Sequence, residues 1–200
     1  MLASKLTSCV IVGALFIGCS SRPTAELKSC QSAMDRGDYD LALSCINKAV
    51  EKAPDLAEPH LVRSRVYRLK TRYADAVLDA TEAIRLDPKL ADAYVSRAHC
   101  YLALDVNGWE EDMRDAIGLQ PKNAFYYRSL GDMLASMRRD PRPEYRQSLK
   151  LETNPKVREE IESKIAVAEK AIHPKPRPSD PGPLQPTSPF DALPPMKKLE

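Results

Sequence analysis

Small and apolar residues recur at a fixed interval in the middle of the chain. Within residues 39–88, one pattern of such residues occurs twice at an offset of 34 residues. The two copies are Tyr39, Ala42, Ala49 and Pro54, then Tyr73, Ala76, Ala83 and Pro88. A fixed period of this length is typical of helix-turn-helix units that stack into a solenoid. The pattern therefore predicts an all-α fold built from repeated helix pairs.

The residue types in this pattern suit closely packed helices. Ala42 and Ala49 lie seven residues apart and form one stripe where a second helix can approach closely, and Ala76 and Ala83 repeat that stripe. The proline of each copy stops a helix and redirects the chain. We therefore expect each unit to consist of two antiparallel helices.

These residues resemble the tetratricopeptide repeat (TPR) family, which has small residues, large apolar residues and a proline at fixed positions. The best match is residues 57–90, with Ser64, Tyr67, Tyr73, Ala76, Ala83 and Pro88 in place. The resemblance implies a right-handed α-α superhelical solenoid of about four helix pairs. The expected TPR domain of the chain covers 23–172, with repeats at about 23–56, 57–90, 91–123 and 124–155.

Residues 156–172 follow the last repeat and have apolar positions at helical spacing, with charged residues on the other face. We expect a capping helix, because the last repeat of a solenoid otherwise exposes its apolar face to water. Nine of the 17 prolines fall within the remaining tail, 173–200. This composition predicts an extended, disordered segment that serves as a spacer or as a partner motif.

The third repeat departs from the family pattern. Pro121 comes one residue early, so we expect its turn to have lost a residue. Counting back from Ala116 and Pro121 places the bulky Trp109 at a position that is small in the other repeats. The second helix of this repeat, at about 109–119, is therefore expected to be irregular, with the helix pair splayed or shifted in register.

The N-terminal residues have the features of an export signal. One lysine precedes an apolar run over 10–17, which has the length of a secretory signal core and is too short for a membrane span. The run leads into the letters LFIGCS at 15–20, which resemble a bacterial lipoprotein signal. An ordinary signal peptide with an incidental cysteine is the alternative.

The lipoprotein resemblance implies removal of a signal peptide, 1–18, and attachment of lipid such as palmitate to Cys19. Residues 19–22 would then link the lipid to the folded domain. Acyl chains on one residue provide a stable anchor, because each buried methylene contributes ~0.8 kcal/mol. The implied location is the bacterial cell envelope, at the outer membrane and facing the periplasm, with the inner membrane left open.

Export makes the remaining cysteines relevant, because the periplasm permits disulfides. Cys30 and Cys45 fall on the two helices of the first repeat and lie opposite each other across the turn. They either form a disulfide or are two small core residues. Cys100 has no evident partner and is expected to be buried.

Composition and motifs give little sign of catalysis. The formal net charge is +2, which does not imply a nucleic-acid partner. His60, His99 and His173 are far apart, and no cysteine pair, glycine-rich loop or nucleophile elbow has the spacing of a metal, phosphate or nucleophile site. We therefore expect no enzymatic activity and no cofactor.

The TPR resemblance also implies a binding surface, the concave groove lined by the first helix of each repeat. Arginines beside apolar residues would suit a peptide with apolar anchors and a carboxylate, because guanidinium groups pair bidentately with carboxylates. A solvated helix face is the alternative. The predicted lining is Leu61, Arg65, Arg68, Asp92, Val95, His99, Leu102, Phe125, Arg128 and Asp132.

Taken together, these features predict a membrane-anchored TPR adaptor that binds a protein or peptide partner in the bacterial cell envelope. One alternative is a pilotin-like factor for secretin or pilus assembly, since such factors are also lipoproteins built from these repeats. Another is an accessory subunit of an envelope enzyme such as a peptidoglycan hydrolase. The identity of the partner and the formation of a homodimer stay open.

Overall fold

The computed structural model describes residues 23–172, and every regular element in that range is an α-helix. The expectations for the signal peptide, for Cys19 and for the proline-rich tail lie outside these residues. The helices are α1 (Thr24–Asp35), α2 (Tyr39–Lys52), α3 (Ala57–Leu69), α4 (Tyr73–Leu86), α5 (Ala91–Ala103), α6 (Trp109–Leu119), α7 (Ala124–Ser136), α8 (Arg142–Leu151) and α9 (Pro155–Ile172).

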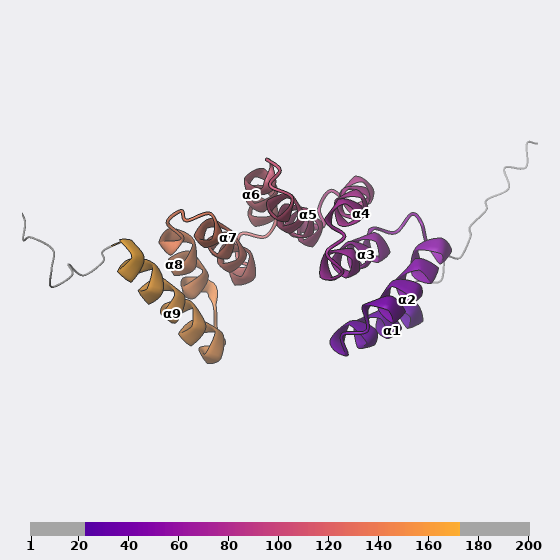
Figure 1. Ribbon diagram of the computed structural model, residues 1–200, viewed down its shortest axis with the longest axis horizontal. Coiled ribbons are helices and arrows are strands. Elements are labelled where there is room, and N and C mark those ends of the chain that lie inside the picture. Colours follow the sequence, from indigo (N-terminus) through magenta and orange to yellow (C-terminus); the bar gives the residue numbers. More distant parts are fainter. Residues whose placement is uncertain (1–22, 173–200) are drawn as a thin grey trace, which may run out of the picture.

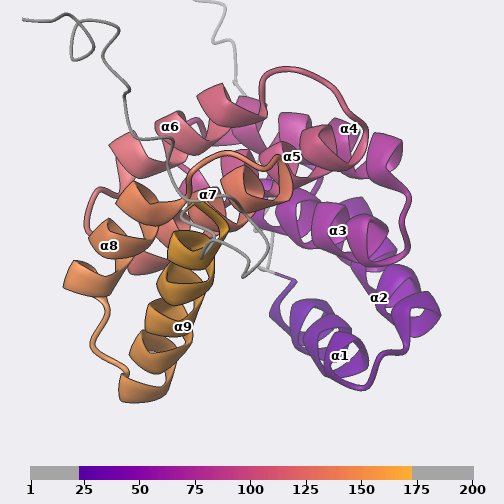
Figure 2. The ribbon, with the colours of Figure 1, turned by 60° about the vertical axis from the view of Figure 1, so that its left-hand side comes forward.

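Consecutive helices pack into the pairs α1–α2, α3–α4, α5–α6 and α7–α8, and α9 covers α8 at the C-terminal end. Figure 1 shows these pairs following one another along an arch whose two ends stand apart. The turned view in Figure 2 shows the same succession, with α9 lying beside α8. The predicted all-α TPR solenoid with a terminal helix is therefore confirmed.

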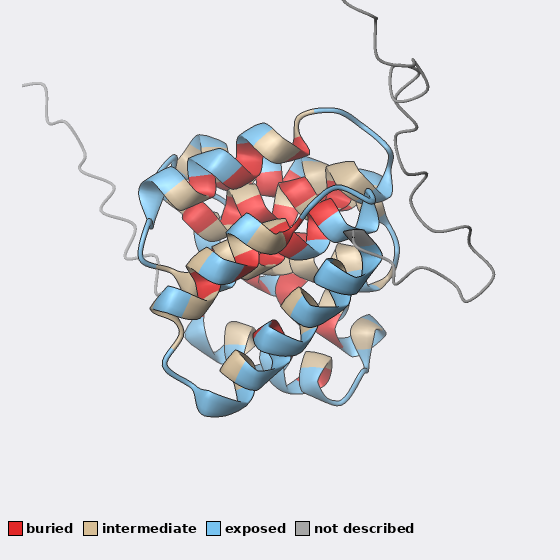
Figure 3. Ribbon diagram, turned by 90° about the vertical axis from the view of Figure 1, so that its left-hand side faces the viewer, coloured by how far each residue is buried: buried red, intermediate tan, exposed pale blue. Residues whose placement is uncertain are grey.

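The small residues of the repeating pattern lie at the closest helix contacts. Ala42, Ala49, Ala76 and Ala83 have no exposed surface, as expected for a stripe that a second helix covers. Figure 3 shows that buried residues form the interior shared by successive helices, while the outward faces are exposed. Each helix pair therefore buries its apolar surface against its own partner helix and against the next pair.

The turn inside each helix pair recurs at the 34-residue period of the apolar pattern, except that the last interval is one residue shorter. Gly37, Thr71, Asp105 and Arg138 each have a positive φ, between 54° and 74°. A residue other than glycine adopts this left-handed conformation at a cost of roughly 1–2 kcal/mol. The stacking of the helices therefore imposes the turn geometry even where the residue type does not favour it.

The third repeat is one residue shorter than the second, as expected, but the residue is not lost from the turn between its two helices. Five residues, 104–108, join α5 to α6, whereas three residues, 70–72, join α3 to α4. The turn is therefore longer, and the missing length comes from the first turn of α6. The prediction that the turn had lost a residue was wrong, although the expected bounds of the helix, 109–119, are confirmed.

Trp109 explains this change. Its indole is 7% exposed and belongs to the core cluster that also contains Val95 and Met113. An indole is too large for the close helix contact that Ala42 and Ala76 make, so α6 begins at Trp109 and the preceding residues form a loop. Gly108 permits this start with a φ of 106°. The helix itself is regular, which corrects the expected irregularity.

The terminal helix α9 covers the end of the solenoid. Ile161 is fully buried, and Val157, Ile165 and Ala168 are partly buried along the same face. This is the apolar pattern that predicted the cap. Among the helices of residues 23–172, none has both the length and the apolar character required to cross a membrane.

Candidate binding groove

The first helices of the second, third and fourth pairs, which are α3, α5 and α7, form a groove of about 430 Å³. The groove contains six of the ten residues that were predicted to line it, and adds Ser96 and Asn123. The six predicted residues are Arg65, Arg68, Asp92, Val95, His99 and Phe125. The structure therefore brings the centre of the predicted surface together.

Asp92 connects all three helices across the groove. Its carboxylate accepts a hydrogen bond from Arg65 of α3 at 2.6 Å and another from the Tyr126 hydroxyl of α7 at 2.6 Å. Burial and the bond to Asp92 raise the pKa of Tyr126 well above its ordinary value, so the hydroxyl stays protonated and donates. The charge of Arg65 is thus already matched by an acid of the protein.

Arg68 is one helical turn further along α3 and has a different environment. Its Nε atom is buried and has no hydrogen-bond partner. In the described part of the chain, the ion pairs of the groove arginines belong to Arg65 and Arg128, and none involves Arg68. Because a buried donor without a partner costs about 1–3 kcal/mol, this guanidinium is a strong candidate for contact with an anionic ligand.

His99 of α5 lines the same groove as Arg68. Burial, and after it the positive charge of Arg68, lower the pKa of His99 to about 4, although Asp132 acts in the opposite direction. The ring is therefore neutral near pH 7, and its Nε2 atom lies 2.9 Å from the hydroxyl oxygen of Ser129. A neutral imidazole beside Arg68 leaves the positive charge of the groove concentrated on that arginine.

The C-terminal end of the predicted surface is closed by contacts with α8 and α9. Arg128 lies 3.8 Å from Glu160 of α9 and stacks over the Phe125 ring at 5.7 Å. Asp132 accepts hydrogen bonds from Tyr145 and Lys164, each at 2.8 Å. The structure therefore places Arg128 and Asp132 in contacts that stabilise the cap and not in the groove.

Two predicted apolar lining residues belong to the core. Leu61 is 4% exposed and packs in a cluster with Ala83 and Ala93, and Leu102 is partly buried against the cluster around Trp109. They were wrongly assigned because the side chains at these positions turn toward the neighbouring helices.

Asn123 lines the groove but was not predicted. Its position before an apolar helix could have drawn attention to it, because asparagine there is a common N-cap. Its side chain accepts from the Phe125 amide at 3.1 Å.

The cysteines of residues 23–172 carry free thiols. Cys30 is buried and Cys45 is partly buried in the same apolar cluster between α1 and α2. Burial raises the pKa of Cys30 to about 11, and the neighbouring Cys45 adds to this effect. In the structure, therefore, the two cysteines pack in this cluster as free thiols, one buried and one partly buried, and the disulfide stays a prediction. Cys100 is buried, as expected.

Comparison with solved structures gives the same architecture. The chain is 20% identical to TTC0263, a thermophilic TPR protein of Thermus thermophilus, with a TM-score of 0.64 over 75% of this chain and 82% of that one. It is 19% identical to MamA protein, with a TM-score of 0.56 over 80% of this chain and 98% of that one.

A third structure is the first TPR of Spaghetti (RPAP3), which is bound to the HSP90 peptide SRMEEVD. It is 21% identical to this chain, with a TM-score of 0.54 over 60% of this chain and 95% of that one. By sequence, 68 residues are 32% identical to a protein SGT1 homolog of Oryza sativa subsp. japonica. That match covers 34% of this chain and only 18% of the rice protein. No protein-family model matches the chain.

The helix pairs, the buried small residues and these structural likenesses agree. Residues 23–172 have the fold of TPR domains, with a groove on the first helices that contains one arginine without an acidic partner.

Proposed function

We propose that this chain is an adaptor of the bacterial cell envelope, anchored by lipid on Cys19, that binds a protein or peptide partner in the groove formed by α3, α5 and α7. The TPR fold supports a role in binding, because it is typically a scaffold for protein interactions and not a catalytic fold. The solved TPR domain of Spaghetti in complex with an acidic HSP90 peptide shows that this fold can hold such a segment.

Arg68 is the observation that carries the proposal. A folded protein rarely leaves a buried donor without a partner, and such a group calls for an explanation in terms of a ligand, a solvent molecule or strain. A carboxylate would give Arg68 the charge-assisted hydrogen bonds that it does not make to the described residues. Phe125 is 46% exposed at the edge of the groove and offers an apolar contact beside that carboxylate.

The charges available in the groove indicate which kind of ligand it can bind. Asp92 is already occupied by Arg65 and Tyr126, and His99 is neutral, so the groove offers the charge of Arg68 as its uncommitted cation. We therefore infer a peptide with one critical carboxylate, either a chain terminus or an acidic side chain, next to an apolar residue. A polyanion such as nucleic acid would require several free cations along the surface.

A peptide array tests this specificity. The array displays heptapeptides that vary at the last three positions, each made with a free C-terminal carboxylate and as the amide, and each acidic side chain is also replaced by its neutral amide counterpart. We expect the purified protein to bind a subset of peptides that contain an apolar residue near a carboxylate, and to lose those peptides when the carboxylate is removed. Equal binding to peptides without any carboxylate would overturn the proposed recognition.

A further inference from the structure

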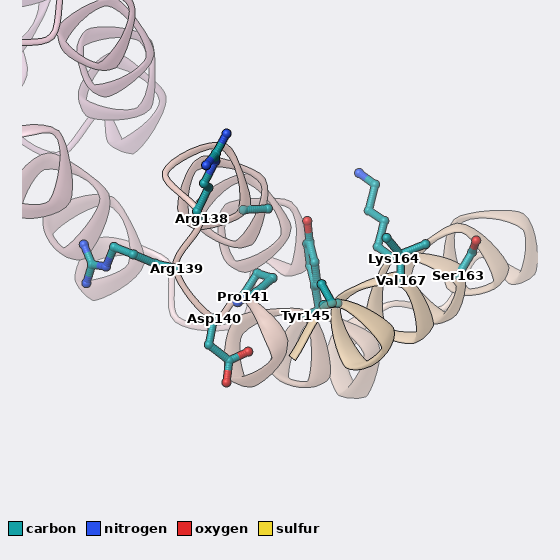
Figure 4. A pocket seen from close by; sticks show the side chains of 11 residues that line it. Arg138, Arg139, Asp140, Pro141, Tyr145, Ser163, Lys164 and Val167 are labelled. Atoms are coloured by element: carbon teal, nitrogen blue, oxygen red, sulfur yellow. The ribbon is translucent and has the colours of Figure 1, made fainter. Parts of the chain in front are cut away.

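A second groove lies at the C-terminal end of the solenoid, away from the surface formed by α3, α5 and α7. It has a volume of about 590 Å³ and runs between the α7–α8 connection and the last half of α9. Figure 4 shows Tyr145 of α8 between Pro141 on one side and the α9 side chains Lys164 and Val167 on the other. We call this surface the end groove.

The end groove has an apolar lining that the described residues leave partly uncovered. Val167 is 64% exposed, although it lies on the helix that caps the solenoid. Ala135 is also exposed and Ala168 is partly buried, whereas Pro141 and Tyr145 line the groove as buried residues. A partner that covered this lining would remove apolar surface from water, which contributes roughly 25 cal/mol per Å².

The rim of the end groove is positively charged, but most of its charges already have partners. Arg139 pairs with Glu110 of α6, and Lys164 bonds to Asp132 and Glu160. Asp140, the acid of the rim, accepts two hydrogen bonds from the guanidinium of Arg142 and one from its backbone amide. Within residues 23–172, no ion pair involves Arg138, so its charge is available to an acidic occupant.

We propose that the occupant is the chain's own segment 189–194, with the apolar side chain of Phe190 in the end groove and Asp191 paired with Arg138. The described structure ends at residue 172, and Ala171 lines the groove, so the tail leaves α9 at the mouth of this site. The segment has the letters PFDALP. It combines the two large apolar residues and the acid that the groove requires.

Charge favours this part of the tail over the part that directly follows α9. Residues 173–179 contain a lysine and an arginine and no acid, and the free cation of the rim would repel them. Residues 180–195 contain two aspartates and neither lysine nor arginine. Only in the segment 189–194 does an aspartate of this stretch stand between two large apolar residues, Phe190 and Leu193.

The connecting chain is long enough for the segment to return. The 17 residues 173–189 reach roughly 50 Å at ~3.1 Å per residue in an extended polyproline conformation. Pro181 followed by Gly182 is a strong reverse-turn signal at the middle of this stretch. A short tether also gives the segment an effective concentration on the order of millimolar, so that weak contacts suffice for docking.

Photo-crosslinking in the full-length chain tests the proposal. A benzophenone amino acid replaces Val167 in the end groove or, as a control, Leu78, which is 70% exposed on α4. Chains labelled with heavy nitrogen are mixed with unlabelled chains, so that mass spectrometry separates links within one chain from links between two. We expect position 167 to link to 189–194 of the same chain and position 78 not to do so.

Two kinds of result would overturn the proposal. Links from position 167 to a heavy-light pair would assign the groove to a second copy, and links to a different protein would assign it to an external partner. Links to 173–179 in place of 189–194 would contradict the argument from charge. Absence of any link to the tail would have the same effect.

A charge exchange tests the specific pair. Arg138→Glu or Asp191→Arg alone should reduce the crosslink yield at least fivefold, because each places like charges together. The double variant should restore at least half of the original yield. Phe190→Ser should also reduce it, whereas Leu184→Ser, which lies in the connecting chain, should not. Failure of the double variant to restore the yield would exclude the pairing of Arg138 with Asp191.

Discussion

Arg97 and Asp112 form a bidentate pair in which the arginine donates from Nε at 2.9 Å and from Nη2 at 2.7 Å. The previous repeat contains the same arrangement, between Arg63 and Asp79, at 2.7 and 2.8 Å. Arg63 also donates a hydrogen bond to Asn47 of α2, and Arg97 donates one to Thr81 of α4. Each arginine thus reaches the second helix of the preceding repeat. Each arginine therefore connects three helices and fixes the stacking of neighbouring repeats.

Asp112→Asn should lower the free energy of unfolding by about 3 kcal/mol, because it leaves the partly buried Arg97 without its counter-charge. Asp115 lies on the same helix and is exposed, so Asp115→Asn is the matched control and should change stability by less than ~0.5 kcal/mol. Urea denaturation of both variants measures the difference. Equal midpoints would show that the bidentate pair does not stabilise the repeat contact.

The fold could be predicted from the sequence because small residues and prolines recur in it at a fixed interval. Such residues at one period predict helix pairs, and the buried alanines follow from close helix packing. The buried pair of Arg97 and Asp112 was not predicted, because Asp112 stands among three other acids and the group has the composition of a solvated helix face. Only the position of α5 against α6 distinguishes Asp112 from its neighbours.

The candidate groove was predictable only in part, for a related reason. Position within a repeat indicates which helix face a residue occupies, and six lining residues follow from that. Whether an arginine on that face is free depends on acids in other repeats, such as Asp92 for Arg65 and Glu160 for Arg128. These partners are distant in sequence, and their pairing could not be deduced without the curvature of the solenoid and the position of α9.

His99 should make the protein sensitive to acid. Its folded-state pKa of about 4 lies below the ordinary value of 6.5, so its contribution to stability is complete above pH 6.5 and is lost as the pH falls toward 4. The loss amounts to at most about 3.5 kcal/mol, because each difference of one in pKa between the folded and unfolded states corresponds to ~1.4 kcal/mol. His99→Gln should therefore lose less stability than the unmodified protein between pH 7 and pH 4. Parallel stability profiles would contradict the assignment.

The state of Cys30 and Cys45 can be decided by counting thiols. With the free thiols of the structure, the unfolded mature protein should show three reactive groups, from Cys30, Cys45 and Cys100. In the native protein at pH 8, Cys30 should react slowly, because its raised pKa keeps it protonated. One reactive thiol after unfolding would instead establish the disulfide, which would close a 15-residue loop and stabilise by up to ~3 kcal/mol.

The proposed anchor depends on the thiol of Cys19. Cys19→Ser should abolish labelling by radioactive palmitate and leave the uncleaved precursor, with its apolar segment, at the inner membrane. Fractionation of labelled cells measures both effects, and Ser20→Ala serves as the matched control because it leaves the thiol in place. Normal cleavage and release of the Cys19 variant would show that the segment is an ordinary signal peptide.

The proposal that the α3–α5–α7 groove binds a carboxylate is tested most directly by measuring affinity and stability together for Arg68→Gln. The probe is the tightest free-carboxylate peptide from the array, and the control is Arg85→Gln, whose arginine is exposed on α4 and paired with Glu82. Removing a charge-assisted contact costs about 1.5–3 kcal/mol, so Arg68→Gln should weaken calorimetric binding at least tenfold, while Arg85→Gln leaves it unchanged. Because the buried Nε of Arg68 has no partner in the folded protein, the same substitution should leave the unfolding free energy equal or higher. Undiminished peptide affinity at matched stability would contradict the account.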